Sequence, residues 1–244
     1  MTPAPMLAEF ATRLACGLAA MLCLAPWRVV PPKFFQTHCQ VILGLLVLAA
    51  LDRSRLGGER WDVYVTIVAA VAAFLASACW GLGLPRVGVP LSAAIAAATG
   101  ALLMRPWSPV DAIGRLASAA LLGSTLTAML LGHHYLTAPA MSIGPLRRFV
   151  KLMGVSLAAR VAVALLAFFS LSPTTPRPEN FALFLGVRWV MGVVGVSLAT
   201  WMTWQTVKIR STQSATGILY IAMTLALFGE LSGLALGRSL GVNL

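Results

Sequence analysis

Eight apolar stretches, most of them close to the roughly 20 residues that a membrane span requires, follow one another along the chain and constrain its fold more than any other feature. They cover residues 6–25, 34–51, 62–83, 87–104, 112–136, 146–171, 180–206 and 212–237. A helix of that length crosses the hydrocarbon core of a bilayer, which is about 30 Å thick. We therefore predict an all-α, polytopic integral membrane helix bundle of about eight transmembrane helices with short loops.

The composition indicates the same class. Of 244 residues, 59% are hydrophobic and 10% are charged, and the mean hydropathy is +0.87. A soluble domain carries about 25% charged residues, so this chain has too few polar side chains to cover a surface in water. The excess of 18 Lys and Arg over 7 Asp and Glu is then typical of loops held against anionic lipid headgroups. We expect no nucleic-acid partner.

Nothing in the sequence divides the chain into parts. No internal repeat is visible and the loops are too short for an extramembrane domain, so residues 1–244 are predicted to form a single transmembrane domain. The N-terminus lacks the basic region of a signal peptide, and we interpret the first apolar stretch as a retained helix. The cysteines show no spacing typical of a metal site, so no metal ligand is predicted.

The acidic residues suggest an orientation in the membrane. An even number of spans puts both termini on one side, here called side A, and the opposite side is side B. Six acidic residues lie at side A, namely Glu9, Asp52, Glu59, Asp62, Asp111 and Glu179, and none lies at side B. Only side B is then strongly positive, as suits the anionic cytoplasmic leaflet. We predict a multi-pass protein of a bacterial inner membrane with both termini outside the cytoplasm.

All three histidines are predicted to lie at side B. His38 opens the second span, whereas His133 and His134 close the fifth and point about 100° apart if the helix continues through them. We call these three and their expected neighbours the side-B rim: His38, His133, His134, Tyr135, Arg147, Arg148, Lys208, Arg210 and Gln213. An imidazole can hydrogen-bond a quinone carbonyl, and two histidines from different helices can hold a b-type haem. The rim could instead hold an anionic headgroup, or its residues could be ordinary interfacial side chains.

Charged residues also occur within the predicted spans. At about 1.5 Å per residue, Glu230 lies roughly 10 Å and Arg188 roughly 13 Å from the side-A ends of their spans. Arg160 lies near mid-depth, and Arg13 lies in the first turns of the first span. Ionised groups at such depths need partners, so we predict that Glu230 pairs with Arg188 or Arg160. These four charges would either form a proton or ion path, or only fix the packing of the helices.

The chain contains no nucleotide-binding, zinc-protease or serine-hydrolase motif, so no catalytic residue is predicted. We predict a non-catalytic membrane subunit of an electron-transfer or quinone-linked respiratory complex, with other membrane subunits as partners. The alternatives are a small transporter or channel for an anionic or protonated solute, and a structural or lipid-binding membrane protein.

Overall fold

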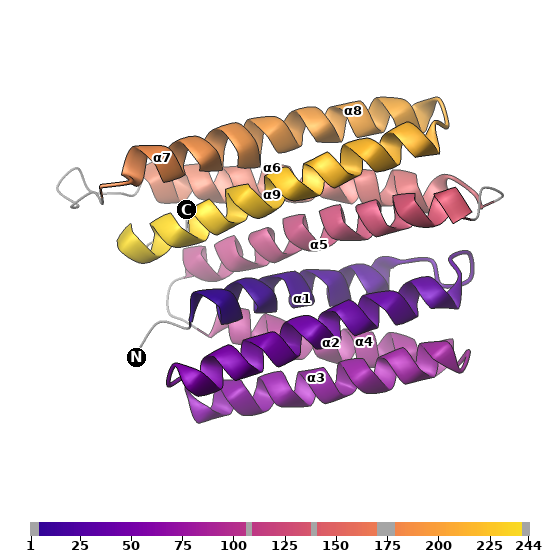
Figure 1. Cartoon of the computed structure of the whole chain (residues 1–244), viewed down its shortest axis with the longest axis horizontal. Helices are drawn as coiled ribbons and strands as arrows, with labels where there is room; N and C mark the ends of the chain where they lie inside the picture. The colour runs from indigo at the N-terminus through magenta and orange to yellow at the C-terminus, as the bar shows by residue number, and fades with distance from the viewer. Residues whose placement is uncertain (1–4, 106–108, 138–140, 170–178, 241–244) are drawn as a thin grey trace. The chain divides into compact units, whose positions relative to one another are not determined.

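The structure is a computed structural model that describes residues 5–105, 109–137, 141–169 and 179–240. Within these residues, 8 helical segments are long and apolar enough to cross a membrane, and no β-strand occurs. The predicted all-α transmembrane bundle is therefore confirmed, and the chain is an integral membrane protein. The elements, shown in Figure 1, are α1 (Met6–Leu24), α2 (Pro32–Arg55), α3 (Arg60–Gly81), α4 (Pro85–Met104), α5 (Pro109–Thr137), α6 (Gly144–Phe169), α7 (Phe181–Gly186), η1 (Val187–Gly195), α8 (Val196–Lys208) and α9 (Thr212–Leu240).

The chain divides into two compact units, Met1–Arg105 and Pro106–Leu244. In the first unit, α1 packs against α2, α2 against α3 and α3 against α4, and α4 packs back against α1. In the second unit, α5 packs against α6 and α9, and α8 also packs against α6 and α9. Each unit is thus a closed ring of four membrane-spanning segments. The single domain expected over residues 1–244 stays a prediction.

Side A and side B are used below for the two ends of each unit. Within a unit, side A is the end at which its first helix begins. Prolines and glycines lie at several helix ends. Pro32 and Pro85 occupy the first turns of α2 and α4, where a missing N–H breaks no helical hydrogen bond. Gly57 and Gly83 adopt φ values of 75° and 71° in the turns after α2 and α3, a conformation that glycine tolerates best.

The core of the first unit combines small residues with aromatic side chains at side B. Trp80 of α3 is 2% exposed and stacks on Phe35 of α2 with ring centroids 4.1 Å apart. Gly88 of α4 leaves room for this indole, because a Cβ there would lie 2.6 Å from the ring. The pair therefore joins three helices of the ring near their side-B ends.

The seventh membrane-spanning segment changes its winding along its length. It begins as the α-helix α7, continues as the π-helix η1 and ends as the α-helix α8. The backbone of η1 touches that of α9, because a Cβ on Gly192 would lie 2.7 Å from the Cα of Gly229. Two glycines at this point allow the close approach. Arg188 lies four residues before Gly192 and Glu230 directly follows Gly229, so this contact brings the two charged residues together.

Candidate functional site

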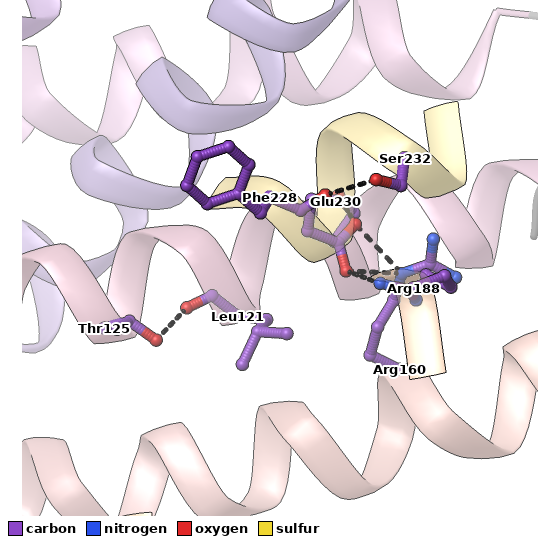
Figure 2. A network of polar contacts seen from close by, with 8 residues as sticks. Leu121, Thr125, Arg160, Arg188, Phe228, Glu230 and Ser232 are labelled. Carbon is purple, nitrogen blue, oxygen red and sulfur yellow. Dashed lines mark hydrogen bonds and ion pairs between the residues drawn. The ribbon is translucent and has the colours of Figure 1, made fainter. Parts of the chain in front are cut away.

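Four polar side chains from four different helices meet inside the second unit. Glu230 of α9 accepts hydrogen bonds from Nη1 of Arg188 at 2.6 Å and from Oγ of Ser118 at 2.5 Å. Nε of Arg160 lies 3.1 Å from both carboxylate oxygens. Figure 2 shows the two arginine side chains converging on this carboxylate. We call Ser118, Arg160, Arg188 and Glu230 the Glu230 cluster.

The Glu230 cluster is shielded from solvent. Its four side chains belong to residues that are at most 2% exposed. Counted along α5, α6, the seventh span and α9, each residue lies about 10 to 15 Å from the side-A end of its helix. Charged groups at this depth in a bilayer are expensive unless they find partners or water. Burying the Glu230 cluster at this depth therefore lowers the stability of the folded protein.

Arg188 is the least satisfied member of the Glu230 cluster. Among the residues that the structure describes, neither its Nε nor its Nη2 has a hydrogen-bond partner. Two guanidinium groups face one carboxylate, so the three ionised side chains together carry a single positive charge. Buried N–H groups without partners call for an ordered water or an ion that completes them. The donor set and its charge match an anion.

The sequence predicts part of the Glu230 cluster. Glu230 pairs with Arg188 and with Arg160, the two partners considered from their depth. Ser118 is not predicted, because a single serine in an apolar helix gives no signal of its role. Neither the π-helix nor the contact between Gly192 and Gly229 is predicted, since both depend on how two helices pack.

A second polar network lies at side A of the first unit. Arg53 donates to the hydroxyl group of Thr12 at 3.0 Å and to that of Thr66. Each hydroxyl in turn donates to the carbonyl group one turn earlier, that of Ala8 or of Asp62. Both threonines thus use donor and acceptor at once, and they hold a guanidinium group that is 4% exposed.

Other charged residues of the first unit are engaged within or between its helix ends. Arg13 pairs with Glu9 one turn earlier in α1 at 2.5 Å, so the structure places it in this unit and not in the Glu230 cluster. The carboxylate of Asp52 in α2 accepts the N–H of Ala8 at 2.8 Å. Arg105, which is partly exposed, pairs with Glu59 at 2.9 Å and with Asp62.

The histidines of the side-B rim have different surroundings. His133 is exposed, and its Nδ1 lies 3.4 Å from the hydroxyl oxygen of Tyr220 in α9, a neighbour that the sequence does not predict. His134 is half-buried, since α5 continues through both residues and turns them in different directions. Tyr135 is buried and donates to the carbonyl group of Ser142 at 2.5 Å.

His38 belongs to the first unit and lies in its core. It is 0% exposed, its ring centroid lies 4.0 Å from that of Phe34, and its Nδ1 lies 2.8 Å from the carbonyl oxygen of Phe34. The expected grouping of His38 with His133 and His134 stays a prediction, and so does the haem site built on it.

Two lysines at side B of the second unit share one aromatic ring. Nζ of Lys151 lies 5.6 Å and Nζ of Lys208 lies 5.7 Å from the ring centroid of Trp204. The other basic and polar rim residues of this unit are half-buried or exposed at the same end: Arg147, Arg148, Arg210 and Gln213. The rim of the second unit is therefore a basic surface with an imidazole and a phenol in contact.

No cluster of His, Cys, Asp and Glu that could hold a metal ion occurs in the described part of the chain. Comparison with protein-family models, with curated proteins and with solved structures finds no match for this chain.

Proposed function

We propose that the second unit binds a small anion at Arg188 and transports it across the membrane. The observation that carries this proposal is the pair of buried Arg188 nitrogens, Nε and Nη2, that have no hydrogen-bond partner among the described residues. They adjoin a cluster with net positive charge, deep in a membrane-spanning unit. An anion would supply both the missing acceptor and the missing negative charge.

The ligand of such a site is an anion and not a cation. The acceptor groups of the Glu230 cluster are already used, because the Glu230 carboxylate receives donors from three helices. The unused groups are N–H donors, which repel a cation and favour an acceptor of negative charge. The planar guanidinium group of Arg188 suits oxyanions such as nitrate as well as halide ions.

Hydroxyl groups continue from the Glu230 cluster toward side B and support passage of an ion. Thr125 lies on the same face of α5 as Ser118, about two turns further along, and is 0% exposed. Ser156 precedes Arg160 by one turn of α6 and is 8% exposed. Figure 2 shows that Thr125 donates to the carbonyl group of Leu121, and rotation of the hydroxyl group would turn this donor toward a passing anion.

Flux through proteoliposomes tests this function. The purified protein is reconstituted, and chloride or nitrate efflux is measured under a potassium diffusion potential. Wild-type protein should release the anion faster than empty vesicles, and Arg188→Met should slow release about tenfold or more, as expected for loss of a charge-assisted hydrogen bond. Arg86→Met removes an exposed arginine of the first unit and serves as the matched control. Equal rates for Arg188→Met and wild type would overturn the proposal.

A second candidate function is that of a membrane subunit in an electron-transfer complex, with quinone bound at the side-B rim of the second unit. The contact between His133 and Tyr220 at an exposed basic surface supports it. The imidazole would hydrogen-bond the quinone carbonyl, and Lys208 and Arg210 would stabilise a reduced quinone anion. Other membrane subunits would be its partners. This candidate site is built from residues of the second unit alone.

Quinone content tests the second candidate. Protein purified in a mild detergent should carry extractable quinone, and His133→Ala should lower that content while the folded yield stays the same. His134→Ala, whose residue is half-buried beside it, is the comparison variant. Quinone content that is unchanged in His133→Ala would remove this candidate and would leave the anion site untouched.

A further inference from the structure

An apolar groove runs along the outside of the first unit, between α2 and α3. Its volume is about 430 Å³. Its lining is aliphatic and aromatic apart from one serine, and consists of Leu43, Val47, Ala50, Leu51, Ser54, Val63, Ile67, Ala70, Val71 and Phe74. Several of these side chains are exposed, among them Val47 at 45%, Val71 at 53% and Phe74 at 59%. The groove is thus open to whatever surrounds the unit in the membrane.

The length of the groove matches one leaflet of a bilayer. From Leu43 to Ser54, α2 rises about 17 Å, and α3 rises about the same distance from Val63 to Phe74. The hydrocarbon core of a bilayer is about 30 Å thick, so one leaflet accounts for roughly 15 Å. The groove therefore extends from side A to the middle of the membrane, as a single lipid acyl chain does.

Aromatic residues mark the side-A end of the groove as the membrane surface. Trp61 is 63% exposed and Tyr64 is 64% exposed, and both lie within a turn of Val63. Exposed Trp and Tyr rings near a helix end are typical of the headgroup level. The one polar lining residue, Ser54, also lies at this end.

Two arginines flank the same end of the groove. Arg55 follows Ser54 directly, Arg60 precedes Val63 by three residues, and both are exposed. The nearby acidic groups are engaged elsewhere, since Asp52 accepts the N–H of Ala8, and Glu59 and Asp62 both accept hydrogen bonds from Arg105. The charge at the mouth of the groove is therefore positive and complements a phosphate group.

We propose that this groove binds an anionic phospholipid, with one acyl chain between α2 and α3 and its phosphate group held by Arg55 and Arg60. The two parts of the site recognise the two parts of the ligand. The apolar groove is long enough to hold an acyl chain that spans one leaflet. The two arginines favour an anionic headgroup over a zwitterionic one. This site is independent of the Glu230 cluster and of the anion proposed to bind there.

Native mass spectrometry of the detergent-solubilised protein tests the headgroup site. Phosphatidylglycerol and phosphatidylcholine with identical chains are titrated separately. Wild-type protein should retain phosphatidylglycerol more strongly, and the double variant Arg55→Ala with Arg60→Ala should weaken its binding about thirtyfold, at about fivefold for each arginine near a headgroup. Arg86→Ala, an exposed arginine at the other end of the unit, should bind as wild type does. Equal affinity of the double variant and wild type would overturn the proposal.

A matched pair of substitutions on α3 tests the groove itself. Val71→Phe fills the groove, whereas Val68→Phe adds the same bulk at a residue that is 65% exposed and lies outside the groove lining. Phosphatidylglycerol binding should fall in Val71→Phe and persist in Val68→Phe. If Val71→Phe instead dissociates an oligomer and leaves lipid binding unchanged, the groove is an interface between two copies of the chain and the lipid proposal is wrong.

Discussion

The two units share one architecture but place their buried charges differently. In the first unit, Arg13 pairs with a residue of its own helix, and Arg53 is held by two threonine hydroxyls near the end of α2. In the second unit, Glu230 joins donors from three other helices in the core. Arg53 leaves one buried nitrogen without a partner among the described residues and Arg188 leaves two. The same ring of helices therefore holds its buried charges within one helix or by hydroxyl groups in one unit, and across four helices in the other.

The likeness of the units extends to their first helices. In α1, Glu9 is followed four residues later by Arg13, Leu14 and Ala15; in α5, Asp111 is followed four residues later by Arg115, Leu116 and Ala117. The sequence predicts no internal repeat, because so few positions match. Both units nevertheless pack their four membrane-spanning segments in the same order around a ring.

The largest effect is expected from removing the shared carboxylate of the second unit. Glu230→Ala leaves two buried guanidinium groups without their anion and should cost about 3–5 kcal/mol of unfolding free energy. Glu9→Ala should cost less than half as much, because it leaves one buried guanidinium group, that of Arg13, without this carboxylate instead of two. Denaturant unfolding in detergent measures both. Equal losses would erase the distinction between the two units.

A smaller effect is expected where η1 touches α9. Gly229→Ala puts a methyl group against the backbone of Gly192, so one helix must move away from the other, at about 1–3 kcal/mol. Gly217→Ala in the same helix meets nothing within 4 Å and should be neutral or stabilising by about 0.5–1 kcal/mol. Melting temperatures compare the two variants. A Gly229→Ala protein as stable as Gly217→Ala would contradict the contact that positions Arg188.

Arg53 and Arg188 should respond differently to replacement by methionine. Arg53→Met loses two hydrogen bonds to threonines and should destabilise the protein by about 1–2 kcal/mol. Arg188→Met removes the excess positive charge and leaves Glu230 paired with Arg160, so stability should stay the same or rise. Thermal unfolding without added anion reports both signs. A large loss of stability in Arg188→Met would show that Arg188 has a structural role instead.

The smallest effect is expected at the surface of the first unit. Arg105 pairs with Glu59 and Asp62, but the three side chains are 38%, 40% and 26% exposed. Exposed ion pairs contribute about 0–1 kcal/mol, so Arg105→Ala should change the unfolding free energy by no more than that. The change should also shrink at high salt. A loss comparable to that of Glu230→Ala would mean that an exposed ion pair stabilises the protein as much as the buried Glu230 cluster does.

The sequence predicts the helices well because a membrane span is defined by its length and apolar character. Both properties can be read from one stretch of sequence without knowing its neighbours in the fold. The predicted span 62–83 compares with α3 at Arg60–Gly81, and 212–237 with α9 at Thr212–Leu240. Depth along a helix is equally simple to count, which is why the partners of Glu230 could be predicted. Side-chain direction is harder to predict, because it depends on which neighbour each face meets.

The candidate site shows where prediction from sequence ends. Ser118 joins the Glu230 cluster through the packing of α5 against α9, and nothing in its neighbourhood marks it among other small residues. Arg188 lies in the π-helix η1, and the valines and glycines of this segment do not predict a π-helix. His38 is buried by aromatic neighbours in its own unit, whereas its position at a span end predicts an interfacial residue.

The central claim, that Arg188 binds an anion, is tested most directly by diffraction from crystals grown in bromide. The account predicts an anomalous peak within hydrogen-bonding distance of Nε and Nη2 of Arg188 in the wild-type protein, and no peak there in Arg188→Met. Ordered water alone at these nitrogens in the wild-type crystals, or a bromide peak of equal height in the variant, would contradict it.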